Sequence, residues 1–333
     1  MPADREPDPF HDVFVAPIAA RAVIAGVATG LFESLADEAA DPAAVAERLG
    51  LDPAGVEALA AALTALGYLE AEGGRVRPSA AAARLLVRDS PESIATFAGG
   101  LGRHHWDAMG GLDEALRGGE PAGWHRRGPD DPLWEPYVRG LYELSRGEHD
   151  ANAALVPGEP RELLDVAGGH GAFAMAMCRR HPGLRATVLE LPGSARVGRE
   201  IVAGEGMADR VSFREGDVFE DDLGEGLDAV SAFNLIHHLP PERVLELFRR
   251  ARGALGPGGC LVVGDTDRPP LDSDLRVGAL TGLAFYAESG ARTYSLAEVE
   301  GWLREAGFDR VDAHRNEVSP WRIVVVARLP SAP

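Results

Sequence analysis

The hydrophobic positions change their spacing along the chain, and this change predicts two structurally different parts. From residue 14 to about residue 35 the apolar residues recur at helical spacing. Segments 41–50 and 52–59 each open with Asp-Pro, in which Asp can cap a helix and Pro suits its first turn. Two short helices followed by a small hairpin over residues 68–78 form a winged-helix pattern.

From residue 157 onward the pattern becomes an alternation of short apolar strands and amphipathic helices, for example a helix over 241–255. Strands are expected over 162–166, 186–191, 211–215, 227–234 and 260–265. Such βαβ alternation predicts an α/β fold, a doubly wound and mostly parallel sheet with helices on both faces.

The last segment departs from this alternation. Residues 308–317 and 321–329 are strand-like and are joined by only three residues, so they predict an antiparallel hairpin. A doubly wound sheet that ends in such a hairpin is the layout of class I methyltransferases. We therefore expect three parts: a winged-helix-like domain over 1–100, a helical connector over 101–155 and a cofactor-binding catalytic domain over 156–333.

The connector is rich in aromatic residues and histidines, and two interpretations remain open for it. These side chains either pack the connector itself or form the wall of a substrate pocket. The residues concerned are His104, His105, Trp106, Trp124, His125, Trp134 and Tyr137.

Composition limits the possible partners and locations. The chain has 333 residues, of which 45% are hydrophobic, and a formal net charge of −19. So acidic a surface repels phosphate, which argues against nucleic acid and anionic membranes as partners. We find no apolar run of about 18 residues and no secretory signal, so a cytoplasmic protein is expected. The two cysteines, Cys178 and Cys260, each lie in an apolar run and are predicted to be buried thiols.

A winged helix also suggests a ligand-responsive transcription regulator, which we keep as an alternative. Its recognition helix, over residues 53–66, contains no arginine and has one acid, Glu57. A helix that enters the major groove needs donors for bases and positive charge for phosphates. The Ala/Leu surface of this helix instead favours contact with protein, so we predict a dimerisation domain and a homodimer.

The segment Leu163-Leu164-Asp165-Val166-Ala167-Gly168-Gly169-His170-Gly171 reads as a strand followed by a glycine-rich turn. Glycines allow a tight turn and close approach of the backbone to a ligand at a helix N-terminus. The turn alone is ambiguous, because residues 169–174 also fit the dinucleotide fingerprint G-x-G-x-x-A.

Acidic residues at three successive strand ends favour S-adenosylmethionine over a dinucleotide. Asp165 would crowd a pyrophosphate but suits a cationic amino-acid cofactor. Glu190 ends the next strand, where a ribose diol needs an acceptor. Asp217 and Val218 follow the third strand. Asp217 can accept a hydrogen bond from an adenine amino group, and Val218 can cover the adenine ring. The expected cofactor-binding residues are Asp165, Gly169, Gly171, Glu190, Asp217, Val218 and Asn234.

With these motifs in place, the chain resembles the plant-type small-molecule O-methyltransferases and their bacterial natural-product relatives. The resemblance covers nearly the whole chain and lies in residues 164–171, 188–192, 208–211, 216–219, 234–240, 255–259 and 305–308. It implies methyl transfer from S-adenosylmethionine to an oxygen of a small aromatic molecule by a homodimer. C- or N-methylation, or a fold relative that no longer methylates, are alternatives within the same family.

In that family a histidine after the fourth strand is the general base. His238 falls on this position, and His237 precedes it. Histidine suits the task because its ordinary pKa is close to neutral pH. Asp265 ends the fifth strand and is expected to orient His238, as an Asp orients the histidine of a hydrolase triad. An alternative role for His238 is packing beneath the cofactor.

A magnesium site formed by Asp265, Asp267 and His238 is a further alternative. Two carboxylates two residues apart share a face of a continuing strand. No third carboxylate is evident nearby in the sequence, so we predict no metal.

Overall fold

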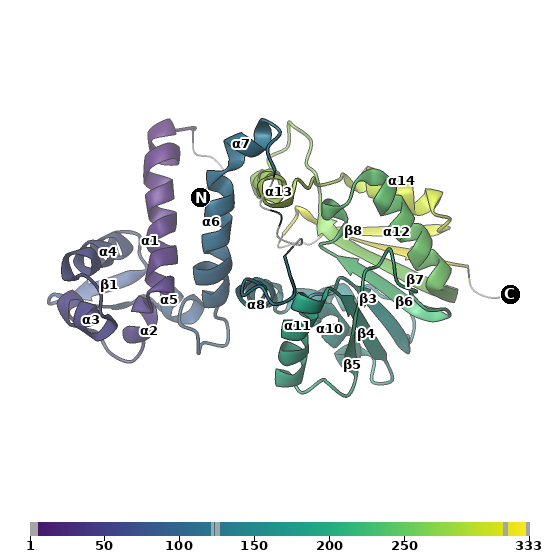
Figure 1. Ribbon diagram of the computed structural model, residues 1–333, viewed down its shortest axis with the longest axis horizontal. Coiled ribbons are helices and arrows are strands. Elements are labelled where there is room, and N and C mark those ends of the chain that lie inside the picture. The colour runs from purple at the N-terminus through teal and green to yellow at the C-terminus, as the bar shows by residue number, and fades with distance from the viewer. Residues whose placement is uncertain (1–5, 121–122, 124–126, 316–318, 331–333) are drawn as a thin grey trace. The chain divides into compact units, whose positions relative to one another are not determined.

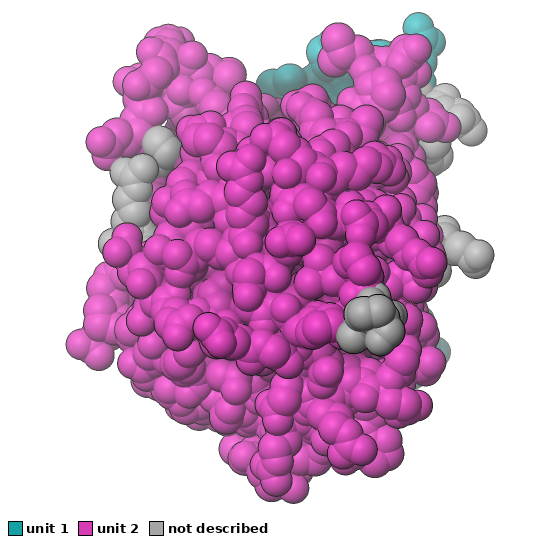
Figure 2. All heavy atoms as spheres, turned by 90° about the vertical axis from the view of Figure 1, so that its right-hand side faces the viewer, with its two compact units in different colours: residues 1–106, 139–144 teal, residues 107–138, 145–333 magenta. Residues whose placement is uncertain are grey.

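The computed structural model describes residues 6–120, 123, 127–315 and 319–330, and its chain divides into two compact units (Figure 1). Unit 1 comprises Met1–Trp106 and Arg139–Leu144, and unit 2 comprises Asp107–Val138 and Ser145–Pro333. Figure 2 shows the atoms of the two units in different colours. We describe each unit by itself.

Unit 1 is mostly helical and includes one small antiparallel hairpin. Its elements are η1 (His11–Val15), α1 (Ala16–Ala28), α2 (Leu31–Ser34), α3 (Pro42–Leu49), α4 (Pro53–Ala65), β1 (Leu69–Glu72), β2 (Arg75–Pro78), α5 (Ala80–Leu85) and η2 (Phe97–Leu101), and α6 (Gly102–Gly110) leads out of it. The side chain of Asp41 accepts a hydrogen bond from Ala43 N, and that of Asp52 accepts one from Gly55 N. These contacts confirm that the two Asp-Pro pairs start helices.

The first long helix of unit 1 leaves much apolar surface uncovered. Phe10, Val13, Phe14 and Ile18 are each more than half exposed. The stretch His11–Ala28 is long and apolar enough to cross a membrane by length and composition alone. The sequence reading found no such run, because Asp12 and Arg21 interrupt the apolar residues. Buried core helices and N-terminal signal sequences share this length and composition, so we assign no membrane span to the stretch.

Unit 2 is built around a seven-stranded sheet (Figure 1). Its strands are β3 (Glu162–Val166), β4 (Arg185–Glu190), β5 (Val211–Glu215), β6 (Leu227–Phe233), β7 (Leu255–Thr266), β8 (Arg310–Arg315) and β9 (Arg322–Arg328). Its helical elements are α7 (Leu112–Leu116), α8 (Trp134–Ser145, which continues into unit 1), α9 (Glu148–Ala153), α10 (Ala172–Arg180), α11 (Pro192–Gly204), η4 (Ile236–His238), α12 (Pro241–Ala254), α13 (Arg276–Ser289) and α14 (Leu296–Glu305).

The strand order is β5-β4-β3-β6-β7-β9-β8. The first five strands run parallel, while β9 pairs antiparallel with both β7 and β8. This topology confirms the doubly wound sheet and its C-terminal antiparallel hairpin. The expected strand over 308–317 is shorter as observed, with β8 at Arg310–Arg315, and residues 316–317 lie outside the described residues.

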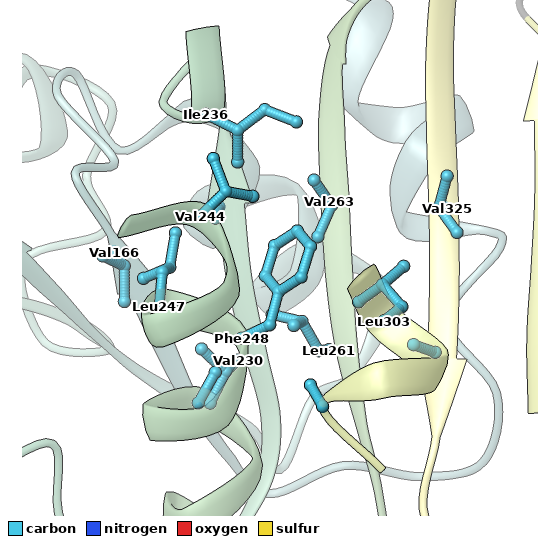
Figure 3. Packing of buried hydrophobic residues seen from close by; sticks show 14 of the residues in the cluster. Val166, Val230, Ile236, Val244, Leu247, Phe248, Leu261, Val263, Leu303 and Val325 are labelled. Atoms are coloured by element: carbon cyan, nitrogen blue, oxygen red, sulfur yellow. The ribbon is translucent and has the colours of Figure 1, made fainter. Parts of the chain in front are cut away.

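The main core of unit 2 fills the space between one sheet face and helices α12 and α14 (Figure 3). Phe248 on α12 is fully buried, and Leu303 on α14 packs into the same cluster. Near-continuous apolar strands are expected here because helices cover both faces of a parallel sheet. Cys178 and Cys260 are buried free thiols, as predicted.

Candidate active site

The glycine-rich turn between β3 and α10 has backbone dihedral angles that few residues other than glycine adopt. Ala167, Gly169 and Gly171 all have positive φ, at 51°, 53° and 73°. Helix α11 also comes very close to this turn, because a Cβ added at Gly198 would lie 2.4 Å from the carbonyl oxygen of Gly169. Glycine is therefore required on both sides of this contact, and the turn is held in one conformation.

Glu190, at the end of β4, is bonded directly to the turn. Its Oε2 accepts a hydrogen bond from Gly169 N at 2.8 Å, and its Oε1 accepts one from Leu191 N at 2.7 Å. Burial raises the pKa of Glu190 to about 7 against these two hydrogen bonds, which favour the ionised form. The structure thus brings together two residues that the sequence placed in the cofactor site, Gly169 and Glu190.

Asp165 lies beneath the turn rather than on its open side. Its side chain is 1% exposed, and its Oδ1 accepts a hydrogen bond from Ser231 Oγ at 2.6 Å. A Cβ added at Gly168 would lie 2.4 Å from Asp165 Oδ2, so the carboxyl group fills the space under the turn. Burial raises the pKa of Asp165 to about 7. In this position the carboxyl group supports the turn, and the expected contact of Asp165 with the cationic cofactor stays a prediction.

Asp217 and Val218 follow β5 and lie beside the end of β4. Gly216 N donates to the carbonyl oxygen of Glu190 at 3.0 Å, which joins the two strand ends. Asp217 is exposed, and its Oδ1 accepts a hydrogen bond from Phe219 N at 2.8 Å. Val218 is buried. An exposed carboxylate next to an apolar side chain is the combination that the sequence reading assigned to adenine.

Asn234 lies on the other side of the turn, directly after β6. Its φ is +52°, in the left-handed region, which Asn tolerates better than most residues. Its N–H donates to the carbonyl oxygen of Gly264 at 2.8 Å. Because β5, β4, β3 and β6 are neighbours in this order, the predicted cofactor residues follow one edge of the sheet, at the carboxyl ends of its strands. Ligands of doubly wound folds bind at this edge.

The structure corrects the expected partner of Asp265. His237 Nδ1 lies 2.8 Å from Asp265 Oδ1, and both side chains are 2% exposed. His238 Nδ1 instead lies 3.1 Å from Ser289 Oγ on α13. The expected pairing of His238 with Asp265 is therefore wrong. Both histidines belong to the 3₁₀ turn η4, in which neighbouring side chains point about 120° apart, so only one of them can face β7.

The Asp265 partner fixes which nitrogen of His237 carries the proton. An ionised carboxylate only accepts hydrogen bonds, so Nδ1 of His237 must be the donor and Nε2 keeps its lone pair. Thr266 N also donates to Asp265 Oδ1, at 2.7 Å. The ring of His237 stacks on that of Phe285, with centroids 3.8 Å apart and planes 7° apart. An oriented imidazole with a carboxylate behind it is the arrangement of a general base.

The two carboxylates considered for a magnesium site already bond to other residues of the protein. Asp265 bonds to His237, as described above. Asp267 accepts from Leu296 N at 2.9 Å and pairs with Arg315. Within the described ranges no group of three or more His, Cys, Asp or Glu side chains is placed to hold a metal ion.

Several side chains near the strand ends were missed or only half-recognised in the sequence. Ser231, Phe285 and Ser289 carried no motif, because their partners lie far away in the chain. Tyr137 was noticed only as one aromatic residue among several. Burial raises its pKa, and the negative charges of Glu288 and Glu190 raise it further. Trp124 and His125 of the same aromatic set lie outside the described residues.

Comparison with known proteins agrees with this geometry. The family model for the O-methyltransferase domain matches residues 155–309. The chain is 32% identical over 299 residues to 3-hydroxy-5-methyl-1-naphthoate 3-O-methyltransferase of Streptomyces sahachiroi, covering 86% of this chain and 85% of that protein. The chain belongs to the O-methyltransferase family.

Two further similarities bear on the acceptor and the cofactor of this O-methyltransferase. The N,N-dimethyltransferase OxyT of Streptomyces rimosus is 30% identical over 320 residues, 92% of each chain. A solved structure of PigF with S-adenosylhomocysteine (SAH) superposes with a TM-score of 0.82 at 25% identity, covering 95% of this chain and 98% of that one. The family uses S-adenosylmethionine, which is the cofactor of this enzyme.

The residues at the strand ends fit that cofactor. The turn brings the backbone of Gly169 and Gly171 within reach of a ligand, because neither residue has a side chain to obstruct it. The Glu190 oxygens each accept one backbone hydrogen bond and retain lone pairs for two ribose hydroxyls.

Proposed function

We propose that this O-methyltransferase methylates a hydroxyl group of a small aromatic molecule, with His237 as the base. The observation that carries the proposal is the buried His237–Asp265 pair, in which Asp265 lies at the carboxyl end of β7. The stacked Phe285 ring beside His237 favours a flat aromatic acceptor, and the relative from Streptomyces sahachiroi is named for methylation of a hydroxynaphthoate. Its name also supports a place in natural-product biosynthesis.

The residues divide the chemistry between them. S-adenosylmethionine supplies an electrophilic methyl group bonded to a positively charged sulfur. His237 Nε2 takes the proton of the acceptor hydroxyl as the oxygen–carbon bond forms and the carbon–sulfur bond breaks. Asp265 stabilises the imidazolium that results, because its Oδ1 holds the Nδ1 proton. A base is needed because a phenol, with a pKa of about 10, is mostly protonated at neutral pH.

Each cofactor-binding residue has a proposed part in holding the adenosine half. Glu190 accepts hydrogen bonds from the ribose diol, and Asp217 accepts one from the adenine amino group while Val218 covers the ring. The backbone of the turn at Gly169 and Gly171 lies against the amino-acid side of the cofactor. Asp165 holds the turn from below.

The enzyme is proposed to act as a homodimer in the cytoplasm. The proposed domain limits are 1–100 for dimerisation, 101–155 for the connector and 156–333 for catalysis. Support comes from the exposed residues Phe10, Val13, Phe14 and Ile18, which form one apolar stripe on the first helix of unit 1. A second copy of the chain is the occupant we propose for this stripe, because burying apolar area favours association.

An acceptor screen tests the function. The enzyme is incubated with S-adenosylmethionine whose methyl group carries deuterium, together with hydroxynaphthoates, simple phenols, aromatic acids and aromatic amines. We expect labelled product from hydroxyaromatic acceptors and its loss in His237→Ala. Labelling of amines alone would contradict the proposal.

A further inference from the structure

A chain of polar contacts crosses the end of the sheet between β6, β9 and α9. Arg322, the first residue of β9, donates from Nη2 to Asn234 Oδ1 at 3.0 Å. Its Nε also lies 2.8 Å from Glu148 Oε1 on α9, and the two charged side chains are only 20% and 22% exposed. Three elements distant in sequence are thus joined at Asn234.

Gly264 allows the Phe233 ring to pack against β7 on the same face as this arginine. Thr266 of β7 pairs with Arg322, and Gly264 pairs with Val324, so these glycine and arginine positions share a face of the sheet. A Cβ at Gly264 would lie 2.2 Å from Phe233 Cδ1, so the Phe233 ring occupies the space where a side chain would stand. Arg322 on β9 reaches across β7 to Asn234, the residue that follows β6.

The contact fixes the orientation of the Asn234 amide. A guanidinium group has only donors, so it must face the oxygen of the amide and not its nitrogen. The NH₂ group of Asn234 is then directed away from Arg322. Asn234 has a left-handed backbone conformation, which costs free energy for most residues. This cost is consistent with a functional requirement for the Asn234 side chain at this position.

The position along the sheet edge says which part of the cofactor would meet this amide. In the proposed site, adenine lies at β5 and ribose at β4, and the turn follows β3. The next strand in the sheet is β6, which ends at Asn234. The remaining part of S-adenosylmethionine is its amino-acid portion, whose carboxylate is the only anionic group of the cofactor.

We propose that Asn234 binds the cofactor carboxylate through its NH₂ group and that Arg322 is the positioning residue that holds this amide. Glu148 keeps the guanidinium in place. This inference rests on the course of the cofactor in the proposed site, and it assigns a role to Arg322 and Glu148 that the sequence motifs do not contain.

The test compares two ligands by calorimetry, without catalysis. S-adenosylhomocysteine carries the amino-acid portion, whereas 5′-methylthioadenosine has the same adenosine half and lacks it. We expect Arg322→Gln to weaken S-adenosylhomocysteine binding by about 10- to 100-fold, as for loss of a charge-assisted contact, and to leave 5′-methylthioadenosine binding unchanged. Asn234→Asp retains the arginine partner but presents acceptors to a carboxylate, so we expect a loss at least as large.

The matched control is Arg328→Gln at the opposite end of the same strand, where the arginine pairs with Asp312. It removes the same charge far from Asn234 and should not change the ratio of the two affinities. Thermal melting identifies variants that fail to fold. An unchanged ratio in folded Asn234→Asp and Arg322→Gln overturns the proposal. Equal loss of both ligands in these variants also overturns it, since the adenosine half would then be affected. Failure of the unmodified enzyme to bind either ligand would instead overturn the proposed cofactor site.

Discussion

His237 and His238 are chemically identical neighbours, yet the fold gives them different partners. His237 Nδ1 bonds to a carboxylate, Asp265, whereas His238 Nδ1 bonds to the neutral hydroxyl of Ser289. Only the carboxylate compensates the positive charge that an imidazole acquires when it takes a proton. This difference is the reason why we propose His237, and not His238, as the base.

The two histidines can be separated kinetically. With a phenolic acceptor, His237→Ala should lower kcat by about 10²–10⁴-fold, the usual contribution of a general base, with little change in S-adenosylhomocysteine affinity. Raising the pH should partly rescue the variant, because more phenol ionises unaided. His238→Ala should lose far less. If His238→Ala instead showed the large, pH-rescued loss, the assignment of the base to His237 would be wrong.

Glu190 predicts a pH dependence of cofactor binding. Its pKa is raised by burial to about 7, so below this pH the folded enzyme holds a proton on a group that must accept hydrogen bonds. The ionised carboxylate, which accepts the hydrogen bonds, is therefore lost as the pH falls through the raised pKa of about 7. Affinity for S-adenosylhomocysteine should therefore increase between pH 6 and pH 8.

A Glu190→Gln variant is the control for this titration, and calorimetry at several pH values provides the measurement. Its binding should be weaker at pH 8 and should lose the Glu190 part of the pH dependence. Asp165, whose pKa is also raised to about 7, is the other carboxyl group beside the turn expected to titrate in this range. Flat affinity of the unmodified enzyme over this range would contradict the role given to Glu190.

At the residue scale the sequence predicted which positions carry chemistry better than it predicted their contacts. Glu190 could be placed at a strand end because its spacing from the turn is local information. The sequence analysis chose His238 on the family resemblance, but the partner of each histidine depends on how η4 turns toward β7. The same limit applied to Asp165, whose burial beneath Gly168 is a consequence of packing rather than of pattern.

The glycine-rich turn depends on helix α11 as well as on its own residues. A Cβ at Gly198 would meet the Gly169 carbonyl at 2.4 Å and the Phe213 ring at 2.6 Å. Neither the backbone nor the packed ring can move freely, so the helix or the turn must shift.

Gly198→Ala should therefore destabilise the fold by about 1–3 kcal/mol and weaken cofactor binding, although alanine is the better helix former. Gly204→Ala, at the end of the same helix, has open space at its Cβ and serves as the matched control. Denaturant unfolding and calorimetry of both variants provide the readouts. Equal stability of the two variants would show that the turn has room to yield.

Elements with a strong period were predictable, and the segments between them were not. The parallel strands and the two Asp-Pro helices follow from apolar spacing and capping residues, which act within a few positions. The sequence did not identify helix α13, which contributes Phe285 and Ser289, as part of the site. Its apolar residues do not gather on one helical face, so periodicity carried little information about its contacts.

For the whole molecule, the apolar stripe of the first helix predicts a homodimer. Light scattering after gel filtration should give twice the chain mass, and the double variant Phe14→Glu with Ile18→Glu should give the mass of one chain. These side chains are 57% and 52% exposed, so their replacement leaves the core of unit 1 intact. Leu271→Glu, at a fully exposed position in unit 2, is the control and should remain dimeric. A monomeric unmodified enzyme would contradict the assignment of the stripe to a second copy.

Fold class was predictable at this scale because sheet order follows from the alternation of strands and helices and from the short hairpin link. The acceptor was not predictable. Its binding depends on side chains from separate segments, and the family includes proteins named for transfer to nitrogen as well as to oxygen.

Identifying the atom that receives the methyl group is therefore the most direct test of the proposed function. The enzyme is supplied with S-adenosylmethionine labelled with carbon-13 in its methyl group and with the best acceptor from the screen, and the product is examined by NMR. We predict a methyl signal whose chemical shift and couplings place it on an aromatic oxygen. A labelled methyl group bonded to nitrogen or carbon would contradict the central claim that His237 deprotonates a hydroxyl group for methylation.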